Sequence, residues 1–143
     1  MCHEFKNGVT MSLKRFGVSL EENLLEDLDK IVERKKFPNR SQAIRFLVGQ
    51  SKVEELWEDN ADVAGAIVIV YDHHKKDLQT KSTDIQHDYH DLILSVQHVH
   101  LDHNNCLETI AVRGKAVMLR DLADRLIALK GIKHGKLVMS ACG

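Results

Sequence analysis

The spacing of hydrophobic residues changes along the chain, and each spacing predicts a different element. In residues 14–20, KRFGVSL, the apolar side chains of Phe16, Val18 and Leu20 alternate with polar or small ones, which is the pattern of a short strand. Residues 21–37 instead place leucine, isoleucine and valine at intervals of three and four, with acids in the first turn and bases in the last. This second segment is predicted to be an amphipathic helix.

A second helix is predicted directly after the chain's single proline, Pro38. Asn39, followed three residues later by Gln42, resembles a capping box that opens this helix, and apolar spacing extends it to about Trp57. A lone strand before two helices would leave its backbone edges unpaired, which is unfavourable. We therefore expect residues 14–20 of two chains to pair as an antiparallel ribbon across a two-fold axis.

A two-stranded ribbon of this kind fits the major groove of DNA. Arginine can bind guanine through two hydrogen bonds, serine can contact several bases, and glycine permits close approach. The start of the second helix would direct free backbone N–H groups at a phosphate. The predicted DNA contacts of this module are Arg15, Gly17, Ser19, Asn39, Arg40 and Ser41. Two alternatives stay open at this point, a helical hairpin that only mediates dimerisation and a helix-turn-helix.

The rest of the chain contains strand-like and helix-like segments in the order βαββαβ. This order is that of ferredoxin-like folds, in which helices cover one face of an antiparallel sheet. The predicted strands are residues 63–71, 89–101, 106–114 and 136–141, and the predicted helices are residues 73–86 and 115–131. The chain is therefore predicted to be α+β, with an N-terminal extension at 1–12, the strand–helix–helix module at 13–57 and a second domain at 62–141.

Two imidazoles and a thiol are predicted to come together at one end of this sheet. His98 and His100 are two residues apart in the predicted strand, so their side chains leave the same face. LDHNN at residues 101–105 resembles a tight turn, which could bring Cys106 back beside both histidines. Imidazole and thiolate are ligands for first-row transition metals. The open alternative is two ordinary strand histidines beside a small buried cysteine.

Three ligands leave one coordination place to fill, and His87 is the nearest candidate in the sequence. If the intervening segment is an extended strand, about ten residues at roughly 3.3 Å each hold His87 about 35 Å from His98. His87 could instead complete the site of a neighbouring subunit, which would make metal binding and assembly one event. His90 is expected on the same strand face as His98. Four further histidines are expected to be exposed to solvent, namely His73, His74, His103 and His134.

Composition narrows the class of protein. Hydrophobic residues make up 43% of the 143 positions, and no apolar run reaches the roughly 18–20 residues of a membrane span. The start of the chain lacks the apolar core of a secretory signal, and three widely spaced cysteines argue against a disulfide framework. A cytoplasmic protein with reduced thiols is expected. The formal net charge is −1, yet residues 30–45 carry six bases against one acid, a local cluster that could bind phosphates.

The stretch QHDYHDLILSVQHVHLDHNNCLE at residues 86–108, preceded by strand, helix, NRSQAIR and helix, resembles the nickel-responsive transcriptional regulators. The resemblance runs from Arg15 to about Leu137. It implies a ribbon-helix-helix DNA-binding domain followed by an ACT-like regulatory domain, in a homotetramer made of two dimers. It also implies one Ni(II) per subunit, bound in a square plane by His98, His100 and Cys106 of one subunit and His87 of another.

The same resemblance implies a function. Nickel loading would favour binding to a palindromic DNA operator and repress nickel-uptake genes, so the chain is not expected to be an enzyme. Arg15 and Ser19 match operator-reading positions, whereas Gly17 stands where the family often has threonine. Lys75 and Lys76 match positions that touch the DNA backbone when metal is bound.

Other functions remain open alongside this one. A regulator with the same ligands could sense Cu(II), Co(II) or Zn(II), and the chain could also be a metal-storage module that binds no DNA. A zinc hydrolase would use His98, His100 and Cys106 as ligands, with water in the open place and Glu108 as the base.

Overall fold

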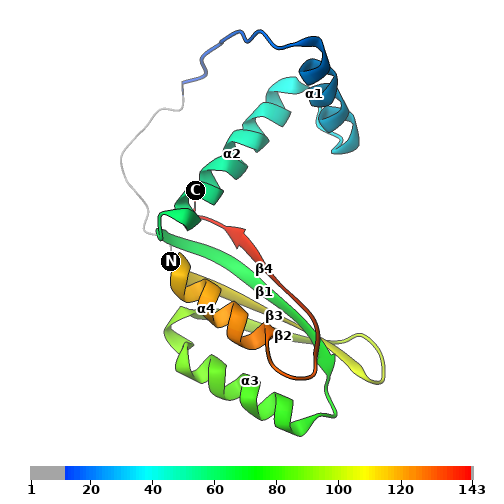
Figure 1. Cartoon of the computed structure of the whole chain (residues 1–143), viewed down its shortest axis with the longest axis vertical. Helices are drawn as coiled ribbons and strands as arrows, with labels where there is room; N and C mark the ends of the chain where they lie inside the picture. Colours follow the sequence, from blue (N-terminus) through cyan, green and yellow to red (C-terminus); the bar gives the residue numbers. More distant parts are fainter. Residues whose placement is uncertain (1–11, 143) are drawn as a thin grey trace. The chain divides into compact units, whose positions relative to one another are not determined.

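The computed structural model describes residues 12–142, which form two compact units that divide between Gln50 and Ser51. The first unit contains α1 (Glu22–Arg34) and the start of α2 (Arg40–Glu58), which continues into the second unit (Figure 1). Both predicted helices of the front module are therefore confirmed. Among the described residues no helix is long and apolar enough to cross a membrane.

The start of α2 is capped as the sequence predicts. The Asn39 side-chain oxygen accepts a hydrogen bond from the backbone N–H of Gln42 at 2.9 Å, which satisfies one of the free donors of the first turn. Beside it, the Arg40 guanidinium donates two hydrogen bonds to the Asp29 carboxylate of α1, at 2.8 and 2.9 Å. Both charges are exposed, so this pair orients the two helices more than it stabilises them.

Residues 14–20, the predicted strand, have no regular secondary structure in the single chain. Phe16 and Val18 are exposed to 76% and 60%, respectively. A strand is held by hydrogen bonds to a neighbouring strand, and residues 12–142 of one copy offer none to this segment. The expected pairing with a second chain is therefore taken up as a proposal below.

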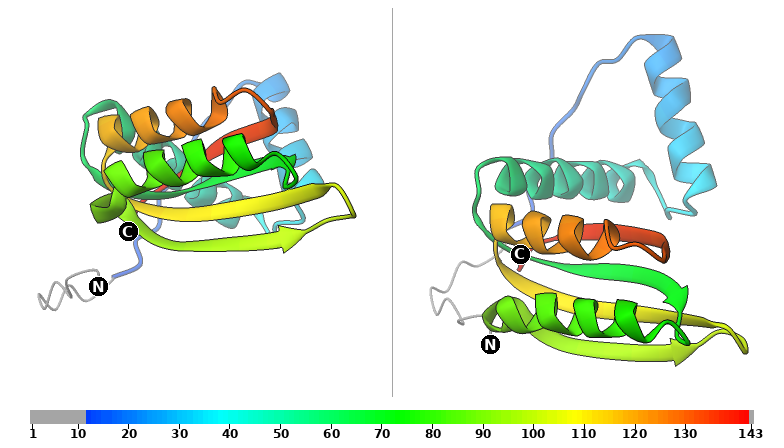
Figure 2. Two further views of the ribbon diagram at one scale, coloured as in Figure 1. Left: turned by 90° about the horizontal axis from the view of Figure 1, so that it is seen from below. Right: turned by 60° about the horizontal axis from the view of Figure 1, so that its bottom comes forward.

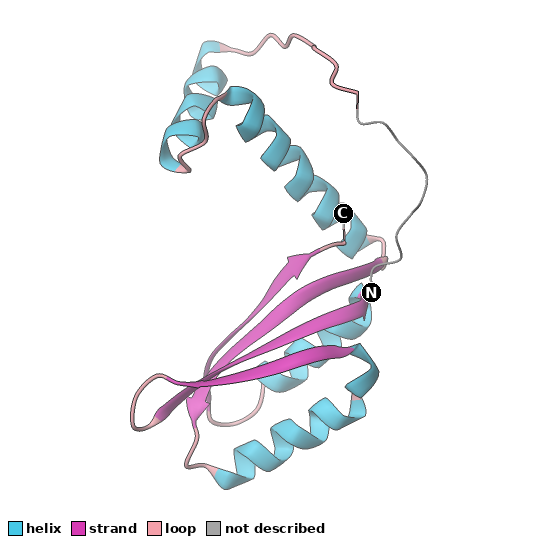
Figure 3. Cartoon of the chain, turned by 180° about the vertical axis from the view of Figure 1, so that it is seen from behind, coloured by secondary structure: helices cyan, strands magenta, loops and turns pink. Residues whose placement is uncertain are grey.

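The second unit has the predicted βαββαβ order. Its elements are β1 (Asp62–Asp72), α3 (Lys76–Asp88), a short 3₁₀ helix η1 (His90–Leu92), β2 (Ile93–His100), β3 (Asn105–Lys115), α4 (Ala116–Ile127) and β4 (Ile132–Ser140). The strands lie side by side in the order β2-β3-β1-β4, and every neighbouring pair is antiparallel (Figure 3). Helices α3 and α4 cover the same face of this sheet (Figure 2). The ferredoxin-like α+β fold is thus confirmed.

The predicted long strand at residues 89–101 begins only at Ile93, and His90 lies in η1. The reason is Tyr89, whose backbone N–H bonds to carbonyl groups of α3 and whose hydroxyl donates to Asp121 of α4. These contacts hold the chain in turns before it can extend. The prediction that His90 shares a strand face with His98 is therefore wrong, and His87 lies in the last turn of α3.

Two boundaries near the C-terminus also differ from the prediction. Helix α4 ends at Ile127, earlier than the predicted residue 131, because the following residues form tight turns. Gly131 takes a positive φ of 104° in these turns, a conformation that glycine adopts easily. Strand β4 then begins at Ile132, four residues earlier than predicted. It pairs with residues 64–71 of β1, with Ile132 opposite Tyr71 and Ser140 opposite Ala64.

The core lies between the sheet and the two helices. Alternate residues of β1 and β3 face it, as the period of a strand requires, and α4 contributes one apolar stripe. The most deeply buried members are Ile67, Ile69, Ile110, Val112, Leu119, Leu122 and Leu126. Trp57 of α2 is 2% exposed and joins this cluster, and its indole N–H donates to the Ser140 carbonyl of β4 at 2.8 Å.

The turn between β2 and β3 is organised by Asp102. Its carboxylate accepts hydrogen bonds from the backbone N–H groups of Asn104 and Asn105, both at 2.8 Å, and from the Asn105 side chain. The Asn105 side-chain bonds are the main cause that lowers the pKa of Asp102, with the two backbone N–H groups next. The ionised carboxylate therefore stabilises the turn.

Replacing Trp57 by phenylalanine should lower the free energy of unfolding by about 1–3 kcal/mol, because the Ser140 carbonyl loses its donor and buried volume is left unfilled. Chemical denaturation at fixed protein concentration measures this change. Val117→Ala, at a side chain that is 57% exposed on α4, is the control and should stay within about 0.5 kcal/mol of the original chain. An unchanged stability for Trp57→Phe would contradict this description of the core.

Asp102→Asn should destabilise the protein at pH 7 and have a smaller effect in acid. The pKa of Asp102 is lower in the folded chain, so its stabilisation is present above the unfolded value of about 3.9 and is lost as the pH falls through the folded value. Denaturation curves at pH 7 and at about pH 3 measure the difference. Asp84→Asn, at an exposed acid of α3, is the control; a pH-independent effect of Asp102→Asn would contradict the assignment.

Candidate metal centre

The antiparallel register of β2 and β3 brings the predicted ligands to one face of the sheet. His98 lies directly opposite Glu108, and His100 lies directly opposite Cys106. On the other side of β3, Tyr71 of β1 is opposite Cys106. Residues that face each other across a ladder point to the same side. Because Tyr71, Cys106 and Glu108 are buried, this is the side covered by the helices.

The distance between two of these groups fits a shared metal ion. The His98 Nδ1 atom lies 4.0 Å from the Cys106 sulfur. With a metal–sulfur bond of about 2.3 Å and a metal–nitrogen bond of about 2.0 Å, as found for zinc, two ligands of one ion lie at most about 4.3 Å apart. Cys106 is 2% exposed, while the His98 side chain is 55% exposed. The sulfur is therefore covered by protein and the imidazole reaches the surface.

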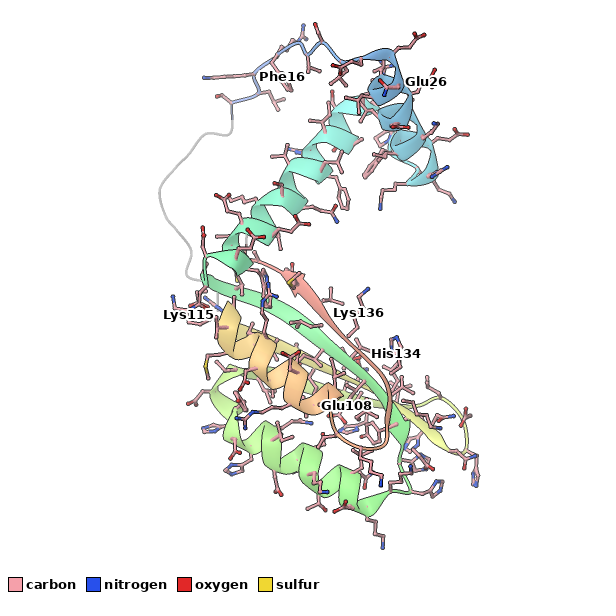
Figure 4. All side chains as sticks on the ribbon, viewed as in Figure 1. Phe16, Glu26, Glu108, Lys115, His134 and Lys136 are labelled. Atoms are coloured by element: carbon pink, nitrogen blue, oxygen red, sulfur yellow. The ribbon has the colours of Figure 1, made fainter. Side chains whose placement is uncertain are left out.

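A buried carboxylate lies beside this pair. Glu108 projects from β3 into the layer between the sheet and the helices (Figure 4) and is 2% exposed. One of its oxygens accepts from the Tyr71 hydroxyl at 2.8 Å and lies 3.5 Å from His98 Nδ1. The other oxygen accepts from the Gln86 side-chain amide at 2.7 Å. Burial and the bond to Glu108 raise the pKa of Tyr71, so its hydroxyl stays protonated and donates.

A cavity of about 180 Å³ separates α3 from the sheet at this point. It is lined by Tyr71, Gln79, Ser82, Thr83, Gln86, His98 and Glu108. Gln86 also donates to the buried Ser82 hydroxyl at 3.1 Å, so the amide joins α3 to the carboxylate of β3. The environment of His98 thus depends on how the end of α3 is held.

A second group of possible ligands lies at the end of β1. Atoms of Asp72, His73 and His74 that could bind metal all lie within 4.8 Å of one another. The ring of His73 is 4.1 Å from that of His74 and meets the ring of His100 edge-on at 4.7 Å. The backbone N–H of His74 is the main cause that lowers the pKa of Asp72.

The exposure predicted for these histidines is mostly confirmed. His74, His103 and His134 are exposed, whereas His73 is half-buried because its ring packs between those of His74 and His100. Adjacent histidines directly after a buried strand were the sequence signal for this cluster. It did not reveal the contact with His100, which depends on how the sheet folds.

His87 is not joined to this centre within the described chain. It is exposed at the end of α3, and its ring lies 5.9 Å from that of His90. No hydrogen bond or ring contact links it to His98, His100 or Cys106 in residues 12–142. The structure therefore brings His98 close to Cys106 and places His100 on the same face of the sheet. Among the described residues, the ligand atoms of these three do not all lie within 4.8 Å of one another.

The predicted DNA contacts lie at the surface. Arg15, Gly17 and Ser19 are exposed in the segment without regular structure. Asn39 caps α2, and Arg40 is bound to Asp29, so its charge is partly compensated. The remaining three predicted contacts are exposed at the starts of α2 and α3, namely Ser41, Lys75 and Lys76.

Glu108 is the residue of this centre whose role sequence reasoning missed. The sequence suggests for it only the role of base in the zinc-hydrolase alternative. A carboxylate within a strand normally predicts a solvent-facing position, so nothing in the alternation indicated that it would be buried. The sequence does contain one indication of this role. Cys106 and Glu108 are two residues apart in a strand, so their side chains must share a face.

Comparison with known proteins is consistent with this geometry. The family model described as the NikR C terminal nickel binding domain matches residues 64–140, and that of the ribbon-helix-helix protein, copG family, matches residues 14–50. A protein of Thermotoga maritima that has not been characterised shares 14% identity, covers 55% of this chain and 96% of its own, and superposes with a TM-score of 0.50. That likeness shows the fold alone.

Relatives with higher identity carry the name nickel-responsive regulator. The protein of Desulfovibrio desulfuricans is 51% identical over 132 residues, which are 92% of this chain and 96% of that one. The protein of Geobacter sulfurreducens is 51% identical over 130 residues, which are 90% of this chain and 94% of that one. The matches to both family models and to nearly the whole length of these relatives lead to one conclusion: the chain belongs to the nickel-responsive regulator family.

Proposed function

We propose that this protein is a nickel-dependent repressor of nickel-uptake genes, which binds a palindromic DNA operator when loaded with Ni(II). The observation that carries the proposal is the 4.0 Å approach of His98 Nδ1 to the Cys106 sulfur, inside a domain matched by a nickel-binding family. His98, His100 and Cys106 would hold one Ni(II) per subunit. Tetragonal sites rich in nitrogen suit Ni(II) and Cu(II).

The fourth ligand is proposed to be His87 of another subunit. The chain from His87 to His98 is not one extended strand, so the first estimate of about 35 Å does not apply. Within the described residues no hydrogen bond or ring contact joins His87 to His98, His100 or Cys106, and the ring contact of His87 is with His90. The exposure of His87 is compatible with a role in a neighbouring site. Such sharing supports a homotetramer, a dimer of dimers.

DNA binding and nickel binding would belong to separate domains of the chain. Residues 13–57 would form the ribbon-helix-helix DNA-binding and dimerisation domain, and residues 62–141 the ACT-like nickel-binding and tetramerisation domain. Residues 1–12 would be an extension, of which 1–11 lie outside the described residues. As a transcription regulator the protein would work in the cytoplasm.

DNA binding would require a second chain. The exposed apolar residues of segment 14–20 support pairing with the same segment of another subunit, which would present Arg15, Gly17 and Ser19 to base edges. Asn39, Arg40 and Ser41 would approach a phosphate at the start of α2, and Arg40 would have to share its guanidinium with Asp29.

Nickel can regulate DNA binding only if it binds the DNA-competent conformation more tightly than the other. Within one chain, Gln86 of α3 donates to Glu108, and Glu108 contacts His98. Lys75 and Lys76 lie at the start of the same helix. Metal binding at His98 would therefore favour one placement of α3, and with it the approach of both lysines to the DNA backbone.

The competing functions differ in what they need from the site. Cu(II), Co(II) or Zn(II) could use the same ligands. A metal-storage protein would need no DNA-binding domain, and the match of residues 14–50 to the ribbon-helix-helix family disfavours that alternative. A hydrolase would need Glu108 free to take a proton from water. In the structure both oxygens of Glu108 accept hydrogen bonds inside the protein, which disfavours that role.

Cys106→Ala and His87→Ala should each weaken Ni(II) binding, and Cys106→Ala should abolish the thiolate-to-nickel absorption band, because only a bound thiolate produces it. Absorption spectra during nickel titration measure both effects. Cys142→Ala, at the exposed cysteine, is the control and should leave the spectrum unchanged. A band that persists in Cys106→Ala would remove this thiol from the site.

Ni(II) should strengthen binding to the protein's own promoter region in a gel-shift titration, more than Cu(II), Co(II) or Zn(II) do. Arg15→Ala should weaken the nickel-dependent complex by roughly five- to 150-fold, because an arginine on a guanine is worth about 1–3 kcal/mol. Lys52→Ala removes the same charge outside the predicted contacts and is the control. Binding that is equal with and without metal would contradict the proposed function, and a stronger response to another metal would change the metal assigned.

A further inference from the structure

Glu108 is a buried anion without a permanent counter-charge among the described residues. It is 2% exposed, and its two direct hydrogen-bond donors, the Tyr71 hydroxyl and the Gln86 amide, are both neutral. The ion pair recorded for it joins His98, at 3.5 Å, and no lysine or arginine of residues 12–142 pairs with it. A buried charge is costly unless it is paired or lies beside a metal. A cation bound at the site would therefore stabilise this carboxylate.

Hydrogen bonds from two other elements hold the Glu108 side chain in place. Each of its oxygens accepts from a separate donor, Tyr71 at 2.8 Å and Gln86 at 2.7 Å. Bonds from donors to both oxygens stabilise the negative charge.

The charge of the centre depends on the oxidation state of the metal. This step rests on the proposed function, in which His98, His100 and the partner subunit's His87 bind as neutral imidazoles. Cys106 binds as thiolate and releases its proton to water. A divalent ion with one thiolate leaves a single positive charge, which the Glu108 carboxylate balances. A monovalent ion such as Cu(I) leaves no charge, so Glu108 would then be an unbalanced buried anion.

We propose that Glu108 is a specificity-determining residue that favours divalent ions over Cu(I) by supplying the counter-charge of the metal–thiolate centre. Thiolate ligands alone select soft ions such as Cu(I), so a site that contains Cys106 needs a further feature to favour Ni(II). Glu108 supplies charge and no coordination bond. It does not distinguish one divalent ion from another, which is left to the geometry of the ligands.

Glu108→Gln tests this inference, because glutamine has nearly the same size and its oxygen can still accept a hydrogen bond, while the charge is lost. The dissociation constants of Ni(II) and Cu(I) are measured on the full-length protein by competition with chelators of known affinity. Ni(II) binding should weaken tenfold or more, within the 10- to 100-fold range typical of residues around metal ligands. Cu(I) binding should stay the same or tighten. Glu58→Gln, at an exposed acid ending α2, is the charge-matched control and should change neither constant.

Two results would overturn the inference. Equal weakening of Ni(II) and Cu(I) would show that Glu108 only supports the fold of the site, and unchanged constants for both would show that its charge has no effect. Failure of the proposed function is seen separately in the original chain. If nickel binding there does not depend on Cys106, the ligand set is wrong whatever Glu108→Gln does.

Discussion

The register between β2 and β3 is the constraint on which the metal centre depends. It places His98 opposite Glu108 and His100 opposite Cys106, so that imidazole, thiol and carboxylate leave one face of the sheet. A slip of one residue would turn the side chains of β2 to the other face. On β3, Ile110 and Val112 are buried against the helices, and this fixes the face that Cys106 and Glu108 share with them. The apolar core therefore also positions the ligands.

The second consequence of this register is a polar network inside an otherwise apolar layer. Glu108 is held by Tyr71 of β1 and Gln86 of α3 and reaches His98 of β2, so three elements and β3 itself meet at one carboxylate. Buried networks of this kind are costly when a member is missing and rigid when all are present. Through the same contacts, metal binding at His98 can favour one position of α3. Lys75 and Lys76, which are proposed to touch DNA, lie at the start of this helix.

Much of this arrangement could be predicted from the sequence. Hydrophobic spacing predicted α1, α2 and the βαββαβ order. The turn at residues 101–105 predicted that Cys106 would return beside the strand that carries His98, and the two lie 4.0 Å apart. Local patterns failed where distant residues decide the structure. The contact of Tyr89 with Asp121 delays the start of β2, and the burial of Glu108 requires three elements to close around it. Residues 14–20, the predicted strand, have no regular structure in one chain, and their pairing with a second chain is part of the proposed function.

The central claim is that each nickel site is shared between subunits, and mixing two inactive variants tests it most directly. His87→Ala and Cys106→Ala subunits, each without a complete site of its own, are unfolded together, refolded and titrated with Ni(II). The Ni(II) concentration is kept at a level where neither variant alone shows the thiolate-to-nickel band. If the site is shared, about a quarter of the sites in randomly mixed assemblies regain all four ligands, and the band returns to that extent. If His87 and Cys106 serve the same chain's site, no mixed assembly regains a complete site and the band stays absent.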